Sequence, residues 1–335
     1  MAVPVKLAID AMSGDHGTPV TVRAALSCLQ AHDDLELILV GDETVLNASL
    51  RTHSEVYSQR LKVQHASEVV AMDELPSKAL RQKKDSSMRV AVDLLKQGRV
   101  EAVISAGNTG ALMATARFVL KTLPGIDRPA IVSPIPAVRG QVHMLDLGAN
   151  VDSTPEQLFQ FAVMGSALIT AMQGVDKPSI ALLNIGSEEI KGNETIKQAA
   201  SLLQASHLNY VGYVEGDGIF LSDVDLVVCD GFAGNVALKT GEGAARMIGQ
   251  FMRQEFGRSW IRKLTALTAL RSLKALARRI DPREHNGATL LGLNGTVIKS
   301  HGSADAVAFA RAIEVGIREV RERVPERVTQ LLADA

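Results

Sequence analysis

Cysteine and aromatic residues are scarce in this sequence. Only two of the 335 residues are cysteines, Cys28 and Cys229, and they stand far apart without the spacing of metal ligands. Neither a disulfide framework nor a zinc site is therefore expected, and the compartment is predicted to be reducing. Because aromatic residues make up only 4% of the chain, the core must rest on Ala, Val, Ile and Leu, which usually fill parallel sheets covered by helices.

Long apolar runs and a strong net charge are missing too. No stretch approaches the ~20 uncharged apolar residues of a membrane-spanning helix, and the N-terminus has no basic region followed by an apolar run. We therefore expect a cytoplasmic protein that can at most associate peripherally with the inner face of the membrane. The net charge of -1 gives no general attraction to nucleic acid or anionic lipid, so an electrostatic partner must meet a local patch.

Several common catalytic signatures are absent. The chain has no phosphate-binding G-x-x-x-x-G-K-[ST], no G-x-G-x-x-G at a helix start, no G-x-S-x-G and no H-E-x-x-H. Cys229 stands in an apolar run, where a free cysteine is more often part of the packing than a nucleophile. A covalent intermediate on cysteine is therefore not favoured.

Short runs rich in Val and Ile alternate with longer helical patterns along the chain. This alternation predicts βα units on a mostly parallel sheet, which is an α/β fold. The predicted strands are 6–10, 35–41, 102–107, 130–136, 142–148, 180–186 and 224–231. No linker or repeat divides residues 1–335, which we interpret as a single unit. In such a sheet, ligands bind at the carboxyl ends of the strands.

The alternation stops at residues 251–286, where a basic helical stretch is predicted as an inserted projection. Its leucines fit two short amphipathic helices better than one, because leucines at every third residue drift around a straight helix. Such a hairpin can lie on a membrane surface. It can equally pack against the partner subunit of a dimer, and both can hold together. The residues expected to meet the membrane are Trp260, Leu264, Leu267 and Leu270.

Three polar loops, two of them rich in glycine, follow predicted strands, and we expect them to open on the same edge of the sheet. The first loop is 105–113, in which Asn108 or Thr109 can cap the next helix and Gly110 permits a tight turn. The free N–H groups of a helix start attract an anion such as phosphate. An ordinary βα turn with a good cap would have the same pattern.

The second loop, 230–239, repeats this arrangement. Gly231, Gly234 and Asn235 are predicted in the turn. Lys239 follows one helical turn further on. Two such loops at one edge favour an anion site more strongly than either loop alone.

The third loop, 300–305, supplies Ser300 and His301 at the start of another helix. An imidazole titrates near neutral pH, so His301 could move a proton or donate a hydrogen bond. It could equally be a structural cap residue. Further polar loops contribute the supporting residues Asp10, Asn150 and Lys191.

Five blocks spread through nearly the whole chain closely resemble the acyl-carrier-protein:phosphate acyltransferase family. They are GNTGAL (107–112), DLGANVD (146–152), NIGSEEIKG (184–192), CDGFAGNVALK (229–239) and LLGLNGTVIKSHGSAD (290–305). One departure is Ser13, where the family usually has a second glycine in its D-x-M-G-G-D opening. That departure affects only the close backbone approach expected at this loop.

The resemblance implies a three-layer α/β/α fold like that of isopropylmalate dehydrogenases and phosphotransacetylases, usually as a homodimer. It also implies that acyl-[acyl-carrier-protein] and inorganic phosphate give acyl phosphate and free acyl carrier protein, with no metal or organic cofactor. The acyl phosphate would then serve a membrane-bound glycerol-3-phosphate acyltransferase in phospholipid synthesis.

This reaction needs no protein nucleophile, because phosphate attacks the thioester and a thiol with a pKa of about 8.5 is a competent leaving group. The protein must hold phosphate against the carbonyl group and stabilise the oxyanion. The expected catalytic residues are Asn235, Lys239 and His301. The expected substrate-binding residues are Asp10, Asn108, Thr109, Gly110, Asn150, Lys191, Gly231, Gly234 and Ser300.

A basic segment is the expected docking surface for the carrier. Acyl carrier proteins of this pathway are typically acidic, and residues 76–99 hold seven Lys and Arg against two Asp. The expected docking residues are Lys78, Arg81, Lys83, Lys84 and Arg89. A solvated helix face explains the same pattern equally well.

Two other classes of function stay open at this point. A phosphotransacetylase that uses a coenzyme A thioester would need the same loops, whereas a metal-dependent hydroxyacid dehydrogenase is disfavoured because no dinucleotide loop or paired aspartates are found. A non-catalytic module that binds carrier protein or lipid could also keep the fold. The intact polar residues of the three loops argue against such a module.

Overall fold

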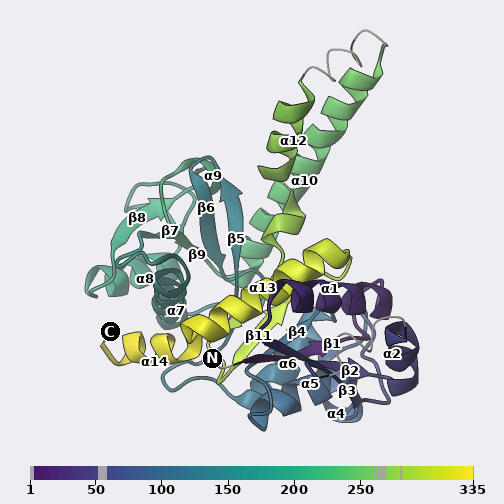
Figure 1. Ribbon diagram of the computed structural model, residues 1–335. Coiled ribbons are helices and arrows are strands. Elements are labelled where there is room, and N and C mark those ends of the chain that lie inside the picture. Colours follow the sequence, from purple (N-terminus) through teal and green to yellow (C-terminus); the bar gives the residue numbers. More distant parts are fainter. Residues whose placement is uncertain (1–3, 52–58, 260–261, 263–268, 280, 335) are drawn as a thin grey trace.

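The fold was determined from a computed structural model, which describes residues 4–51, 59–259, 262, 269–279 and 281–334. The described strands form one 11-stranded sheet with the order β3-β2-β1-β4-β11-β10-β5-β6-β9-β7-β8. Helices lie on both faces of this sheet (Figure 1). The predicted α/β fold is confirmed.

The sheet consists of two parallel halves joined through an antiparallel centre. The first half holds β3 (Leu61–His65), β2 (Leu35–Gly41), β1 (Val5–Asp10), β4 (Ala102–Ser105) and β11 (Thr296–Lys299). The second half holds β6 (Gly140–Leu145), β9 (Leu226–Val228), β7 (Ile180–Leu183) and β8 (Tyr210–Val214). Between them, β10 (Ala288–Leu291) and β5 (Ala130–Ala137) make antiparallel pairs with each other, with β11 and with β6. These three reversals leave the two halves running in opposite directions.

The helices form two layers around the sheet. Alternate strand residues face opposite sides, so Leu7 and Ile9 pack in one hydrophobic cluster while Ala8 packs in another. The layer on the Leu7 side holds α1 (Thr18–Ala31), α2 (Glu43–Leu50), α7 (Pro155–Gln173), α8 (Glu194–Gln204), α13 (Ala306–Glu322) and α14 (Val324–Asp334). The other layer holds α4 (Pro76–Gln82), α5 (Ser87–Lys96), α6 (Thr109–Leu120), α9 (Gly218–Leu221) and the first turns of α10 (Gly231–Gly257).

All of the predicted strands are present, but four further strands were not predicted. Two of these, β3 and β8, lie at the edges of the sheet and are largely only half-buried, so they lack a long apolar run. The other two, β10 and β11, are four residues long and lie near each other in the chain. The strand predicted at 142–148 ends at Leu145, because Asp146 begins a turn held by its own carboxylate.

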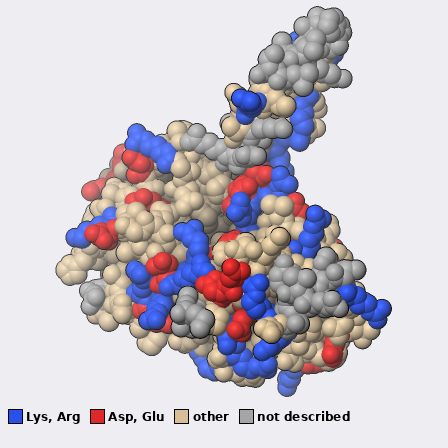
Figure 2. All heavy atoms as spheres, in the orientation of Figure 1, with Lys and Arg blue, Asp and Glu red and all other residues tan. Residues whose placement is uncertain are grey.

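A projection extends from the body of the molecule and contains α10 and α12 (Leu270–Arg279) (Figure 1). Because α10 is one continuous helix from Gly231, the helical region begins well before residue 251, the predicted start of the insertion. The short 3-10 helix η1 (Pro282–His285) leads back to β10. Lys and Arg atoms lie on the described part of the projection (Figure 2). None of the helices within the described ranges is long and apolar enough to cross a bilayer.

Trp260, Leu264 and Leu267 lie outside the described residues. Leu270 is described, and its side chain is exposed at the start of α12. The prediction of a bend between two short amphipathic helices therefore stays a prediction.

One carboxyl group is enclosed in the core beneath α13. Glu319 is buried and accepts a hydrogen bond from the Thr289 hydroxyl group of β10. Its second oxygen, Oε2, has no hydrogen-bond partner among the residues that the structure describes. Burial raises the pKa of Glu319 from 4.5 to about 8, and the hydrogen bond from Thr289 only partly opposes this. Glu319 is therefore neutral in the folded protein at neutral pH.

The neutral state of Glu319 predicts a pH-dependent stability. Between the unfolded pKa and the folded pKa, only the folded protein holds this proton, so its contribution to the free energy of unfolding falls as pH rises, by up to about 1.4 kcal/mol per pH unit. Glu319→Gln should flatten this dependence and make the protein more stable than wild type at about pH 8. Urea unfolding at several pH values measures the effect. Glu326→Gln, at an exposed position of α14, is the control; equal pH slopes for the wild type and Glu319→Gln would contradict the assignment.

Candidate active site

The carboxyl ends of β1, β4 and β11 bring three polar side chains to one edge of the sheet. Asp10 and Lys299 both stand in register with Ser105, from its two sides. The Ser105 hydroxyl group donates to Asp10 Oδ2 over 2.6 Å. Burial raises the pKa of Asp10, while hydrogen bonds from serines, the strongest from Ser105, oppose the shift. The other carboxylate oxygen, Oδ1, is buried without a hydrogen-bond partner in the described part of the chain.

Ser13 fits this edge although the resembled family usually has glycine there. Its hydroxyl group donates to the Asp10 carbonyl oxygen over 3.1 Å and accepts from the Ala106 N–H over 3.1 Å. The serine therefore ties the loop after β1 to the loop after β4.

Lys299 is a member of this cluster that the sequence analysis missed. Its side chain is almost fully buried, and its ammonium group donates to the carbonyl oxygens of Ala106 and Ser300. Burial lowers the pKa of Lys299 to about 8, although the nearby carboxylates of Asp10 and Asp15 oppose the shift. In the sequence, this lysine follows Val and Ile directly in the apolar run TVIKS. Because lysine is rarely buried, a lysine in such a run was the signal that could have marked Lys299 as a candidate site residue.

Asn108, one of the two predicted candidates, caps α6. Its Oδ1 accepts from the Ala111 N–H over 2.9 Å, and its amide group donates to the carbonyl oxygens of Met72 and Glu74 over 2.7 and 3.1 Å. The side chain thus shapes the start of the helix. Thr109 and Gly110 form the exposed first turn, whose N–H groups can attract an anion.

Ser300 and His301 follow β11 and are held by Asn286. The Asn286 amide group donates to the buried Ser300 hydroxyl oxygen over 2.8 Å, and its Oδ1 accepts from the His301 N–H over 2.9 Å. His301 Nδ1 accepts from the Ser303 N–H over 3.2 Å. In the neutral ring the proton therefore sits on Nε2, which can donate to a substrate oxygen.

The electrostatic surroundings keep the His301 ring neutral. Burial lowers the pKa of His301, and the positive charges of Lys239 and Lys299 lower it further. Glu242 and Asp15 act in the opposite direction. These effects show that α10, β11 and the loop after β1 place their charges near one another.

A second cluster lies at the carboxyl end of β6, in the oppositely directed half of the sheet. Asp146 is buried and accepts backbone hydrogen bonds from Ile131, Gly148, Ala149 and Asn150. The Asn150 amide group donates to Asp146 over 2.9 Å and to the Pro129 carbonyl oxygen over 2.9 Å. The Asp146 carboxylate and the Asn150 amide group thus have their hydrogen-bond partners within the protein, and Asn150 stabilises the loop.

The start of α10 packs closely on this second cluster. Gly231, Gly234 and Asn235 lie inside the helix, which Asp230 caps, so their predicted position in a turn is wrong. A Cβ atom at Gly234 would lie 1.9 Å from the Asp146 carbonyl oxygen, and one at Gly231 would lie 2.7 Å from that of Asn150. These glycines let the helix approach the loop. Asn235, one residue further on, is exposed.

The three predicted loops do not share one edge of the sheet. The loops that hold Asn108 and His301 follow strands of the first half, whereas the one that holds Asn235 follows β9, which runs the other way. The reason is the odd number of antiparallel pairings in the centre. Instead, α10 runs along β5 and β6 and carries Lys239 to where its charge acts on Lys299 and His301.

Two of the predicted residues have ionic partners on the surface. Lys239 Nζ pairs with Glu242 over 3.0 Å. Lys191, in the loop after β7, pairs with Glu188 over 2.9 Å. Phosphate at Lys239 would compete with the carboxylate of Glu242.

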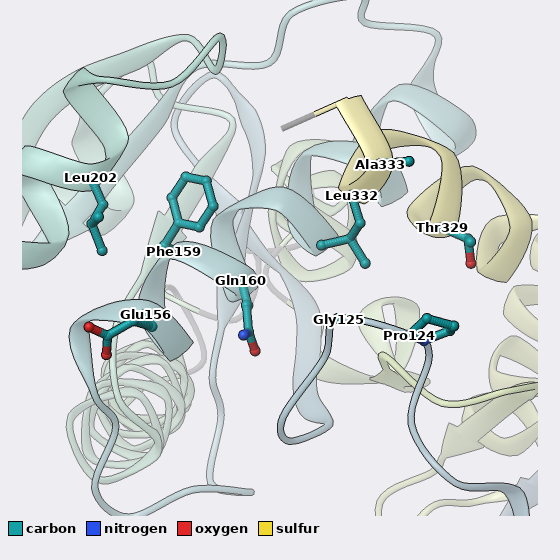
Figure 3. Close-up of a pocket in the computed structure, with 9 residues that line it drawn as sticks. All are labelled: Pro124, Gly125, Glu156, Phe159, Gln160, Leu202, Thr329, Leu332 and Ala333. Atoms are coloured by element: carbon teal, nitrogen blue, oxygen red, sulfur yellow. The ribbon is translucent and has the colours of Figure 1, made fainter.

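The described part of the chain contains an apolar groove of about 440 Å³ (Figure 3). It lies between α7, α8, α14 and the turn after α6, with Phe159, Leu202 and Leu332 among its lining residues. None of the candidate site residues lines it. No group of three or more His, Cys, Asp or Glu side chains in the described ranges could hold a metal ion.

Known proteins match nearly the whole chain. The family described as fatty acid synthesis protein matches residues 5–327. A phosphate acyltransferase of Alkalilimnicola ehrlichii is 60% identical, covering 99% of this chain and 97% of the relative. One of Methylococcus capsulatus is 57% identical, covering 98% and 97%. The chain belongs to the phosphate acyltransferase family.

The comparisons also confirm the type of activity. The chain is an acyltransferase that uses phosphate, an enzyme of lipid synthesis. A phosphotransacetylase structure from Streptococcus pyogenes has the same fold, with a TM-score of 0.61, 18% identity and coverage of 95% and 94% of the two chains. This likeness agrees with the predicted fold family. The interpretation as a non-catalytic binding module is wrong for a member of this family of enzymes.

Proposed function

We propose that the enzyme transfers a fatty acyl group from the thioester of acyl carrier protein to inorganic phosphate. The observation that carries this proposal is the grouping of Lys239 and Lys299, whose positive charges act on the neutral ring of His301, beside the start of α6. A concentration of positive charge with a neutral hydrogen-bond donor suits a phosphate dianion next to a carbonyl group. No metal ion or organic cofactor has a part in this proposal.

The reaction follows from these groups without a covalent enzyme intermediate. A phosphate oxygen forms a bond to the thioester carbonyl carbon, and the carbonyl oxygen becomes an oxyanion. The carbon–sulfur bond then breaks, the thiolate of the carrier leaves and takes a proton from solvent, and acyl phosphate remains. Lys239 and the first turn of α6 hold phosphate, while His301 Nε2 and the Asn235 amide group donate to the oxyanion.

A hydroxylamine trap tests this function. Wild-type enzyme with acyl carrier protein thioester and phosphate should give acyl hydroxamate only when phosphate is present. Asn235→Ala and Lys239→Ala should each lose about 2–4 kcal/mol of transition-state stabilisation, as for other single oxyanion donors. Lys177→Ala, at an exposed position in the loop before β7, is the control. No phosphate-dependent hydroxamate from the wild type would refute the proposal, and higher activity with a coenzyme A thioester would favour the phosphotransacetylase reaction.

The basic helix α4 supports acyl carrier protein as the acyl donor. It lies directly beside the start of α6, because Asn108 bonds to the turn before α4 and Gly110 packs against Pro76. Lys78 and Lys83 share Glu74, and Arg89 pairs with Asp93, so part of the basic charge is neutralised. Arg81 and Lys84 have exposed side chains. A carrier docked there would deliver its thioester next to the proposed phosphate site.

Charge reversal tests this docking surface. Arg81→Glu with Lys84→Glu should raise the KM for acyl carrier protein roughly tenfold at low salt and leave the KM for phosphate unchanged, because only the encounter with an acidic partner weakens. Lys197→Glu on α8 is the matched control. The KM of the wild type should rise with ionic strength. An unchanged carrier KM in the double variant would assign α4 to a solvated surface.

The projection suits a homodimer, a membrane surface or both. Phe232, Val236, Met247 and Phe251 are exposed on α10. At about 100° per residue they fall within an arc of roughly 100°, which makes one apolar stripe. Such a stripe fits a second copy of the chain. The basic residues and the leucines predicted to meet the membrane fit anionic lipid, which would bring the amphiphilic product close to a membrane-bound glycerol-3-phosphate acyltransferase.

Two sets of variants separate these roles. Wild-type protein should be dimeric and should co-sediment with anionic vesicles at low salt. Leu267→Glu with Leu270→Glu should abolish sedimentation and keep the dimer, because negatively charged side chains oppose insertion into an anionic membrane surface. Met247→Glu with Phe251→Glu should weaken the dimer, as measured by light scattering. Loss of the dimer in the first variant, or no vesicle binding by the wild type, would assign the tip to assembly.

A further inference from the structure

Lys299 connects the two loops that hold the proposed phosphate site. Its ammonium group donates to the carbonyl oxygens of Ala106 and Ser300, which belong to the loops after β4 and β11. Ala106 stands two residues before Asn108, and Ser300 stands directly before His301. One buried cation therefore fixes the backbone on both sides of the site.

The charge of Lys299 lacks a directly bonded counter-ion. In the described ranges, none of its hydrogen bonds or ion pairs involves a carboxylate. The acidic groups that face it are Asp10 on β1 and Asp15 in the following loop, and Lys239 on α10 adds positive charge from the other side. A buried cation without direct compensation is costly to the fold, and such groups concentrate at functional sites.

We propose that Lys299 is a positioning residue of the acyl transfer: it locks the loops after β4 and β11 together and supplies the positive potential that retains the phosphate dianion between them. This inference rests on the proposed function. The Lys299 ammonium group is buried and bonds to backbone carbonyl oxygens, so it acts through the backbone, whereas Lys239 and His301 are exposed and can contact the reactants. The interaction with phosphate persists only while Lys299 is charged, because the neutral amine supplies no such potential.

The pH dependence of phosphate use distinguishes this role from a purely structural one. The pKa of Lys299 is about 8, so the ammonium charge is present below that pH and is lost above it. Phosphate becomes more negative as pH rises, which by itself would strengthen its binding. A fall in kcat/KM for phosphate above about pH 8 therefore reports the loss of a positive group.

Two substitutions at this position test the proposal. Lys299→Met keeps the length of the side chain and removes the charge, and it should raise the KM for phosphate roughly tenfold while changing the KM for acyl carrier protein less than about twofold. In this variant, kcat/KM for phosphate should no longer fall at alkaline pH. Lys299→Arg keeps the charge at all accessible pH values, so it should restore phosphate use in part and move the alkaline fall to higher pH. Circular dichroism checks the fold of both.

A second measurement avoids the variants. Inorganic phosphate should raise the melting temperature of the wild type, and this shift should shrink several-fold between about pH 7 and about pH 9. A phosphate affinity that is unchanged over this range overturns the proposal, as does a folded Lys299→Met enzyme with a normal KM and the same pH profile. The proposal is also overturned if Lys299→Met loses activity equally toward phosphate and acyl carrier protein while the fall in kcat/KM for phosphate at alkaline pH remains. These outcomes differ from failure of the proposed function, in which the wild type itself makes no acyl hydroxamate.

Discussion

The reversal of strand direction at the centre of the sheet determines how this enzyme builds its site. Three antiparallel pairings of β10, β5 and their neighbours separate two parallel halves, so the carboxyl ends of their strands point in opposite directions. The polar loops of the two halves cannot form a single crevice in the manner of one continuous parallel sheet. Helix α10 resolves this separation, because it begins beside Asp146 and carries Lys239 toward Lys299 and His301.

Helix α10 can approach the Asp146 loop closely because glycine residues stand at the contact. Any Cβ atom at Gly234 would collide with the Asp146 carbonyl oxygen, so only glycine permits this contact. The loop itself is rigid because the Asp146 carboxylate accepts several backbone N–H groups and the Asn150 amide group. A shift of this loop would displace the first turns of α10 and with them Asn235 and Lys239. The Asp146 loop thus determines where Asn235 and Lys239 lie in the proposed site.

The buried ionisable groups of the enzyme fall into two kinds. Asp146 accepts hydrogen bonds at both carboxylate oxygens, which oppose the rise in its pKa that burial causes, and Glu319 avoids the cost of burial by staying protonated. Asp10 and Lys299 differ, since Asp10 keeps one oxygen without a partner in the described residues and Lys299 bonds only to carbonyl oxygens there. Incomplete compensation is found at the edge where the phosphate site is proposed. The uncompensated charge of such groups can interact electrostatically with a bound substrate.

The sequence by itself determined the α/β class, most strand positions, a cap at Asn108 or Thr109 and the family, because these follow from local periodicity, capping chemistry and long matching blocks. It could not predict that Gly231 and Gly234 lie inside a helix, or that Lys299 is buried beside Asp10, because both depend on contacts between distant segments. The sheet order was also decided only by the tertiary structure. Strand direction changes with each antiparallel pairing, and no local pattern records how many pairings separate two loops.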